Sequence, residues 1–375
     1  MAIEASLVWQ SEQASHCDRL LLADSACLAD GRWLRAAEQA RRGGEAELAA
    51  APWLQPAGLA VAELAVSQFR LPTQPVSGRF YPHMAFASLG RNPRDMRPAR
   101  VLDAADGRMR VDPNHPLAGR DAKLILRELA QEPTRGVRMV ELFAGPGMQA
   151  PSPNAGVTYF QPAGLRRQDA AADAQFYARA RLTHHLDAAC RAEISALHGR
   201  LIKPALPVVR VLDLMSSWVT HLPADTPAVV QVAGLGMNRE ELAANPLLSE
   251  RVVQDLNAHA ELPWPDAAFD AVICTASIEY LLDPAAVAAQ VRRVLKPGGA
   301  FIVTFSDRWF PSKAIQVWSD LHPYERLGLV LALLRDAGFN DLHSETRRGL
   351  QRPQDDPYIE QRLYSDPLFA AWGAA

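Results

Sequence analysis

Residues 208–223 read VVRVLDLMSSWVTHLP, and this stretch decides the fold. Its first part is a run of β-branched and aliphatic residues, which is typical of a parallel strand buried on both faces. The run ends at Asp213, and small polar and bulky residues follow where a turn into a helix is expected. Ligands of open α/β sheets bind beyond the carboxyl ends of the strands. The residues from Asp213 onward are therefore predicted to border a ligand site.

The chain after this strand continues the same pattern. Four more strands are predicted, in AVVQVAGLGMN (228–238), RVVQDLN (251–257), FDAVICTASIEYL (269–281) and GGAFIVTFS (298–306). Before the last of them, Asp283 can cap a helix that has Pro284 at its first position. The succession predicts an α/β fold, a Rossmann-like doubly wound sheet with a crevice at the strand tips.

The N-terminal part has a different pattern. Residues 60–130 show no sustained helical period, and ARVLDAADGRMRVD (99–112) is predicted to be a hairpin with its turn at Asp106-Gly107. This part is therefore predicted to be mostly β. Residues 136–172 are rich in Gly, Pro and Ala, which is typical of a linker or lid. The predicted domains are thus 1–135 and 173–375, with 136–172 between them.

A helix is predicted over residues 174–202, just before the first strand of the α/β domain. Its N-terminal end is crowded with aromatic and polar groups. They either form a substrate wall over the strand tips or belong to a solvated, arginine-rich first turn. These candidate residues are Tyr177, Arg179, Arg181, His184 and His185. Joint metal binding by the two histidines is not expected, because adjacent residues of a helix point about 100° apart.

Composition limits the classes of function. The 375 residues suffice for two domains, and the net charge of −3 gives no electrostatic case for binding nucleic acid or an acidic membrane. The four cysteines lie far apart, which fits reduced thiols better than disulfides or a zinc site. The start has no basic leader, and no stretch reaches the roughly 18 apolar residues of a membrane span. A cytoplasmic location is expected, the expected partner is a small-molecule substrate, and the oligomeric state stays open.

Residues 254–306, QDLNAHAELPWPDAAFDAVICTASIEYLLDPAAVAAQVRRVLKPGGAFIVTFS, resemble class I S-adenosylmethionine-dependent methyltransferases of the type 11 group. The resemblance extends over about residues 177–369 and implies S-adenosylmethionine as the cofactor. It also implies that Asp255 accepts the adenine amino group, with Leu256 beside the ring. Ser277, Glu279 and Tyr280 would face the methyl donor and the substrate.

The chain departs from that family at two points. The family's first loop reads acidic-x-Gly-x-Gly-x-Gly, whereas residues 213–219 contain no glycine. A serine hydroxyl there could hydrogen-bond the cofactor's amino-acid end. The acidic residue that usually ends the second strand and holds the ribose hydroxyls is replaced by Gly236. Asn238 is predicted to take over one hydroxyl.

Three groups of site residues are predicted. The candidate catalytic residues are Tyr177, His184, His185, Glu279 and Tyr280. The candidate cofactor-binding residues are Asp213, Met215, Ser216, Ser217, Gly234, Gly236, Met237, Asn238, Asp255, Leu256, Asn257 and Ser277. The candidate substrate-binding residues are Arg179, Arg181, Trp218, His221, Arg308 and Trp309. No metal site is expected.

Residues 111–129, VDPNHPLAGRDAKLILREL, resemble the closing segment of SlyD-type FKBP domains. This resemblance implies an FKBP/SlyD-like N-terminal domain. The aromatic residues that line the family's prolyl-isomerase site have no match here, and its histidine-rich tail is absent. A retained fold is therefore favoured over a retained isomerase activity.

The expected reaction is direct transfer of a methyl group to a small nucleophile, with a small thiol, sulfide or methanethiol, as the predicted acceptor. The reasons are the expected aromatic-walled pocket and the lack of any nucleic-acid footprint. Two alternatives stay open. One is a methyltransferase guided to a protein substrate by the FKBP-like half, and the other is a non-catalytic folding helper or peptidyl-prolyl isomerase.

Overall fold

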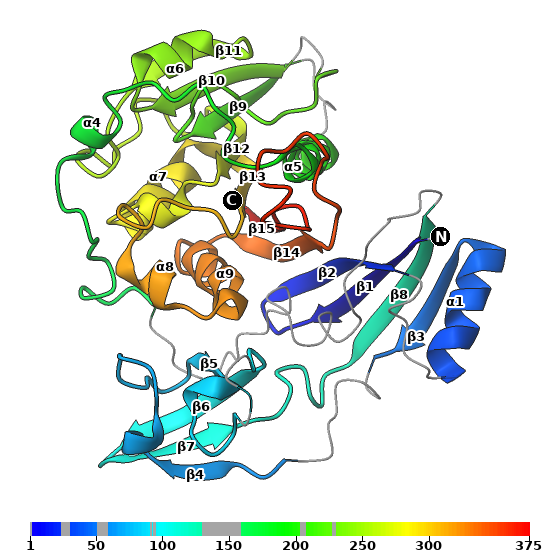
Figure 1. Cartoon of the computed structure of the whole chain (residues 1–375). Helices are drawn as coiled ribbons and strands as arrows, with labels where there is room; N and C mark the ends of the chain where they lie inside the picture. Colours follow the sequence, from blue (N-terminus) through cyan, green and yellow to red (C-terminus); the bar gives the residue numbers. More distant parts are fainter. Residues whose placement is uncertain are drawn as a thin grey trace. The chain divides into compact units, whose positions relative to one another are not determined.

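The computed structural model forms two compact units (Figure 1). It describes residues 2–23, 31–50, 59–90, 92, 95–129, 159–202, 208–226 and 230–375. The first unit comprises Met1–Tyr159, Asp320–Leu329 and Glu345–Gln351, and the second comprises Phe160–Ser319, Val330–Ser344 and Arg352–Ala375. Two short segments of the predicted C-terminal domain therefore belong to the N-terminal unit. Most of the predicted linker or lid, residues 136–158, lies outside the described residues.

The second unit contains the predicted doubly wound sheet. Its strands follow the order β11 (Leu248–Val253), β10 (Val230–Gly236), β9 (Val209–Leu214), β12 (Phe269–Thr275), β13 (Leu295–Phe305), β15 (Leu368–Ala374) and β14 (Asn340–Arg348). Residues 345–348 of β14 belong to the first unit. The pairs from β11 to β13 are parallel, and β15 runs antiparallel to β13. All five predicted strands are present, so the Rossmann-like prediction is confirmed.

The burial of the central strand β9 accounts for its mainly apolar sequence. Val209 and Val211 pack with Val232 and Ile273 in one core cluster, and Leu212 and its neighbours are equally buried. A strand covered on both faces needs apolar residues at successive positions, not at alternate ones. The strand is accordingly apolar from Val209 to Leu212 except at Arg210, which is only half-buried, and it becomes polar again at Asp213.

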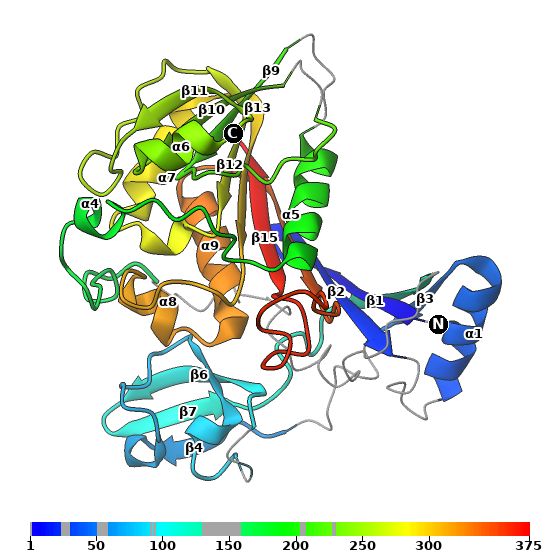
Figure 2. The same cartoon turned by 45° about the horizontal axis from the view of Figure 1, so that its top comes forward.

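Helices cover the two faces of this sheet. Figure 2 shows α5 (Ala188–Leu201) and α7 (Pro284–Val294) on opposite sides of it. The Asp283 carboxylate accepts the Ala286 amide, so the predicted cap of α7 is confirmed. The other helices after residue 160 are α4 (Asp173–Phe176), α6 (Arg239–Ala244), α8 (Gln316–Asp320) and α9 (Arg326–Asp336), with short turns η5 (Ile278–Tyr280) and η6 (Pro323–Glu325). Of these, η6 and the first residues of α9 belong to the first unit. Among the described helices, none is long and apolar enough to cross a membrane.

The predicted helix over 174–202 is wrong in its first half. Helix α4 ends at Phe176, and α5 begins only at Ala188. The reason is Asp187, whose side chain accepts the amides of Ala189 and Cys190 and so starts a new helix there. His184 and His185 therefore lie on an irregular segment.

The helix expected directly after β9 is also absent from the described residues 215–226. Instead, the Asn245 side-chain amide donates to the Ser217 carbonyl and to the Thr220 hydroxyl. Short polar side chains that bond in this way compete with helix formation. The segment therefore keeps an irregular path along the tips of the strands.

The first unit is mostly β, as predicted. One antiparallel group follows the order β2 (Ala14–Ala23), β1 (Ala2–Gln10), β8 (Ala122–Leu129) and β3 (Glu45–Ala49), with α1 (Gly31–Gly43) preceding β3. A separate sheet follows the order β4 (Ala62–Ala65), β7 (Arg108–Asp112), β6 (Pro98–Ala105) and β5 (Phe80–Pro82), with turns η2 (Val66–Gln68) and η3 (His83–Ala85). The predicted β6–β7 hairpin is confirmed, and Asp106 and Gly107 both have positive φ, as its tight turn requires.

Buried ion pairs join the first unit's N-terminal strands to the late segment Glu345–Gln351. Asp18 is fully buried and accepts Nε and Nη2 of Arg348 at 3.1 and 2.6 Å. Thr346 also donates to Asp18, and Arg347 pairs with Glu4. A carboxylate buried in this way depends on its partner, because solvent cannot replace it.

We therefore expect Arg348→Met to lower the free energy of unfolding by about 3–5 kcal/mol, since it leaves the Asp18 carboxylate buried without its guanidinium. Chemical denaturation measures this. The matched control is Arg127→Met, because Arg127 pairs with Glu45 at 2.8 Å on the exposed surface. That variant should lose about 1 kcal/mol or less. Equal losses would contradict the assignment.

Candidate active site

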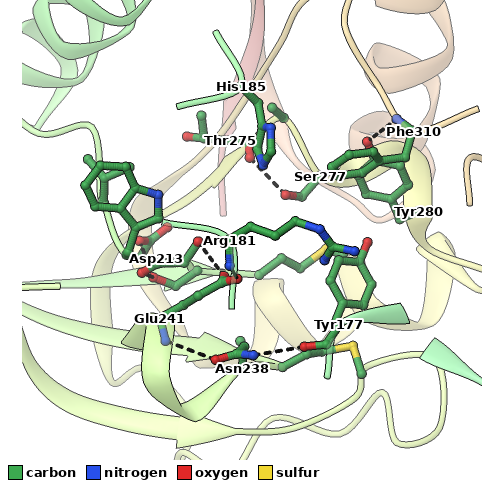
Figure 3. Close-up of a pocket in the computed structure, with 18 of the residues that line it drawn as sticks. Tyr177, Arg181, His185, Asp213, Asn238, Glu241, Thr275, Ser277, Tyr280 and Phe310 are labelled. Carbon is green, nitrogen blue, oxygen red and sulfur yellow. Dashed lines mark hydrogen bonds between the residues drawn. The ribbon is translucent and has the colours of Figure 1, made fainter. Parts of the chain in front are cut away.

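A cavity of about 230 Å³ lies at the carboxyl ends of β9, β10 and β12. Figure 3 shows its walls, which come from the loops after these strands and from the irregular segment before α5. This is the position at which doubly wound sheets bind their ligands. The cavity lies entirely within the second unit.

Most of the predicted site residues line this cavity. They are Tyr177, Arg181, His184, His185, Asp213, Met215, Ser216, Ser217, Trp218, His221, Gly236, Met237, Asn238, Asp255, Leu256, Asn257, Ser277, Tyr280, Arg308 and Trp309. Three others do not line it. Arg179 is exposed outside it, Glu279 is buried behind it, and the missing side chain of Gly234 leaves room for Leu248. Lining residues that were not predicted include Asp173, Glu241 and Gln254.

The glycine-free loop after β9 keeps a glycine-like turn. Met215 stands where the family has its first glycine, and it has a φ of 59°, which is unusual for a residue with a side chain. The Ser216 amide donates to the Leu235 carbonyl at 2.7 Å. A Cβ on Gly236 would lie 2.1 Å from the Ser216 carbonyl oxygen. The glycine that this turn requires is therefore Gly236 on β10, and the loop itself contains none.

Asp213, at the end of β9, is buried under this loop. Its Oδ2 accepts the Ser216 hydroxyl at 2.6 Å. Burial raises the pKa of Asp213 to about 7, and hydrogen bonds from Ser216 and Thr220 oppose part of that rise. The carboxyl group therefore exchanges its proton near neutral pH.

Helix α6 is fixed by Asn238. The side-chain oxygen of Asn238 accepts the amides of Glu240 and Glu241 at 2.9 and 3.0 Å. Its Nδ2 donates to the carbonyls of Tyr177 and Ala178 at 2.9 and 3.2 Å (Figure 3). Asn238 thus caps α6 and holds the wall segment with the same amide.

A buried charge network holds the start of that wall. Asp173 accepts Nη1 of Arg167 with both oxygens at 2.9 Å, and the Asn257 amide donates to it at 2.8 Å. Lys313 is fully buried, with its Nζ 3.3 Å from Asp173 and 2.7 Å from the Ala171 carbonyl. Because every charge in this network has a partner, its burial is tolerated. The network fixes residues 167–173 next to the cavity.

Arginine and aromatic rings form the adjoining part of the wall. The Arg181 guanidinium lies 4.5 Å from the Phe176 ring centre and 5.7 Å from that of Phe310. Phe310 also contacts the His185 ring, and its amide donates to the Tyr280 hydroxyl at 2.8 Å. These contacts place a cation among apolar rings, where cation–π attraction is stronger than in water.

The cavity histidines are neutral at pH 7. Burial lowers the pKa of His185, and Arg181 and Arg308 lower it further, whereas Glu241 opposes them. Burial lowers the pKa of His221 to about 3, and that residue's carbonyl lies 3.0 Å from Nδ1 of His198. Burial raises the pKa of Tyr280, which therefore keeps its proton. The site thus offers imidazole nitrogens as bases and phenols as hydrogen-bond donors.

Comparison with known proteins identifies the domain. Residues 218–303 match the family described as "Methyltransferase domain". These residues, which run from the loop after β9 into β13, are thus similar to a methyltransferase domain. A Mycolicibacterium smegmatis protein named "Probable S-adenosylmethionine-dependent methyltransferase" is 47% identical over 49 residues, which are 13% of this chain and 19% of that protein. The match thus spans about a fifth of that relative's length.

Solved structures show similarity over about half of the chain. An S-adenosylmethionine-dependent methyltransferase from Archaeoglobus fulgidus is 14% identical, with a TM-score of 0.36, and the match covers 49% of this chain and 94% of that one. Haemonchus contortus phosphoethanolamine N-methyltransferase 2, solved with S-adenosyl-L-methionine, is 18% identical, with a TM-score of 0.34 and coverage of 49% and 52%.

S-adenosylmethionine is confirmed as the cofactor of the domain. The residues around the cavity fit it chemically. Asp255 and Glu241 offer carboxylates, and the apolar Leu235 and Leu256 line the same cavity. Carboxylates suit the hydroxyl and amino groups of this cofactor, and apolar side chains suit its adenine ring.

We expect Gly236→Ala to abolish most cofactor binding, because the new methyl group would collide with the Ser216 carbonyl and displace the loop after β9. Gly234→Ala is the matched control on the same strand, since its Cβ would meet only the flexible end of Leu248. The control should lose about 1–3 kcal/mol of stability but keep its affinity. Calorimetric titration with S-adenosylhomocysteine measures both variants. Equal affinities would contradict the assignment.

A second prediction concerns pH. Since the pKa of Asp213 is about 7 in the folded chain and 3.8 ordinarily, the folded state binds the extra proton between these values. The Asp213 contribution should therefore decrease stability as pH rises from 4 to 7, by about 1.4 kcal/mol per unit at most. Asp213→Asn removes this dependence. The free energy of unfolding of the variant minus that of the natural chain should therefore be more positive at pH 8 than at pH 5. Denaturant unfolding at both values checks this, and an unchanged difference would contradict it.

Proposed function

We propose that the second unit transfers a methyl group from S-adenosylmethionine to a small thiol, such as sulfide or methanethiol. The observation that carries the proposal is the pair of guanidinium groups that act on His185, against the opposing effect of the Glu241 carboxylate on the same ring. Arg181 and Arg308 both act on His185, and both lower its pKa. A site with two guanidinium groups and a neutral imidazole favours an anionic nucleophile over a cationic one.

The charge balance of the reaction supports sulfur as the nucleophile. Transfer from a sulfonium to a thiolate or hydrosulfide leaves no charge on either sulfur: the donor becomes a thioether, and the acceptor becomes a thioether or, from sulfide, a thiol. Transfer to an amine would first leave a cationic product among apolar rings and beside Arg181, where a further positive charge is costly. A thiolate also forms more readily beside cations, because they lower the pKa of a thiol.

The chain's residues have distinct roles in this mechanism. When bound, the cofactor supplies an electrophilic methyl group. His185 accepts the proton of the thiol, and Arg181 and Arg308 stabilise the resulting negative charge. The thiolate would then be the nucleophile toward that methyl group, and the thioether of the cofactor would be the leaving group. Tyr280 and Tyr177 keep their protons and shape the wall, so the enzyme contributes mainly alignment and exclusion of water.

We also propose that the first unit is FKBP/SlyD-like and that the protein is cytoplasmic. The first proposal is supported by the turn at residues 114–119, which joins β7 to β8 and in which the Leu117 amide donates to Nδ1 of His115 at 3.0 Å. Methylation of a protein substrate and a non-catalytic folding role remain the alternatives, and both would depend on this unit.

The test is release of S-adenosylhomocysteine by the full-length protein with sulfide, methanethiol and matched small amines. Turnover with thiols alone is expected. His185→Asn should lower kcat/KM for a thiol by about 10²-fold at a pH below the thiol's pKa, and by less above it, where the thiolate forms without a base. His343→Asn is the control, because His343 stacks on Trp372 and does not line the cavity. Amine turnover, or a loss independent of pH, would contradict the proposal.

A further inference from the structure

Strand β10 ends without an acidic residue, and the side chain of Asn238 has no hydrogen-bonding capacity to spare. An amide oxygen accepts two hydrogen bonds and an amide nitrogen donates two. The oxygen of Asn238 is used by the amides of Glu240 and Glu241, and its nitrogen by the carbonyls of Tyr177 and Ala178. Asn238 therefore has no free side-chain atom for the ribose hydroxyl that it was predicted to bind.

Two of the cavity's carboxylates are also engaged elsewhere. Asp173 binds Arg167, Lys313 and Asn257 in the buried network. Asp213 is buried and accepts the Ser216 hydroxyl beneath the loop. Asp255 follows β11, where the family resemblance assigns it to the adenine end. Glu241 is the remaining carboxylate of the described cavity wall.

Glu241 has the capacity that the others lack. Its Oε1 accepts the Arg181 backbone amide at 2.7 Å, and its Oε2 accepts the Ser217 hydroxyl at 2.6 Å (Figure 3). Each carboxylate oxygen can accept a second hydrogen bond. Within the described part of the chain, no lysine or arginine side chain forms an ion pair with it. Glu241 is therefore a half-buried carboxylate at the cavity that retains two acceptor positions.

The cap of α6 places this carboxylate beside the end of β10. Asn238 binds the Glu241 amide, so Glu241 lies in the first turn of the helix that follows the strand. Its partner Ser217 adjoins Ser216, whose carbonyl lies against Gly236. The carboxylate thus lies next to the strand end at which an acidic residue is missing.

We infer that Glu241 binds the vicinal ribose hydroxyls of the cofactor, one with each oxygen. This inference rests on the proposed function. It also connects the cofactor to the wall, because the same carboxylate holds the Arg181 amide and the Ser217 hydroxyl. Occupation of the ribose position therefore steadies the segment that carries Arg181.

The test combines a variant of the protein with a variant of the ligand. S-adenosylhomocysteine and its 2′-deoxy analogue are titrated calorimetrically into the full-length natural chain, Glu241→Gln and Glu240→Gln. Glu240 is the matched control, because it lies on the same helix with its side chain exposed. A hydrogen bond to a charged group corresponds to a change of about tenfold or more in affinity.

The effects of the Glu241 substitution and of removing the 2′-hydroxyl are expected to be non-additive. The natural chain and Glu240→Gln should bind S-adenosylhomocysteine about tenfold or more tightly than the deoxy analogue. Glu241→Gln should lose that preference and bind both ligands about equally.

Three other results would contradict the inference or the proposed function on which it rests. A uniform loss that keeps the preference would assign Glu241 a structural role and overturn the inference while the proposed function stands. The inference is likewise overturned if the natural chain shows no preference, and this measurement does not require the variant to fold. No binding of either ligand by the natural chain would instead overturn the proposed function.

Discussion

The site depends on one close contact, between the loop after β9 and the end of β10. The Ser216 carbonyl lies where Gly236 would otherwise carry a side chain, and the Ser216 amide bonds the carbonyl of Leu235. This contact fixes the position of the loop relative to the carboxyl ends of the strands. From there the hydroxyls of Ser216 and Ser217 reach Asp213 and Glu241. A loop without glycine can thus keep a fixed path, because side-chain hydrogen bonds replace the backbone freedom that glycine would provide.

The wall opposite this loop is stabilised differently, by charge. Lys313 and Arg167 are buried, and both contact Asp173. The next turn of chain presents Arg181 to the rings of Phe176 and Phe310. A buried ion network resists small displacements, since moving one member leaves another charge without a partner. The cavity therefore lies between a loop held by hydroxyls and a segment held by salt bridges.

The sheet could be predicted from the sequence because its central strands are short and mainly apolar, as at Phe269–Thr275. The cap at Asp283 and the hairpin turn at Asp106-Gly107 were also visible, since a few adjacent residues determine them. Glu241 was not predicted, because its role depends on Ser217 and on the Arg181 backbone, which are distant in the chain. The break before α5 was missed for a related reason. Asp187 interrupts a helical pattern that is otherwise continuous, and its carboxylate also accepts the hydroxyl of Ser365. Such long-range partners leave no periodic signal.

The pairing of Asp18 with Arg348 has a consequence for the order of events during synthesis. Their positions are 330 residues apart, although both belong to the first unit. Domains commonly fold from the N-terminus while the ribosome is still adding residues. Here the strand that carries Asp18 is translated 330 residues before its guanidinium partner. The first unit therefore stays incomplete during synthesis until most of the second unit has been translated.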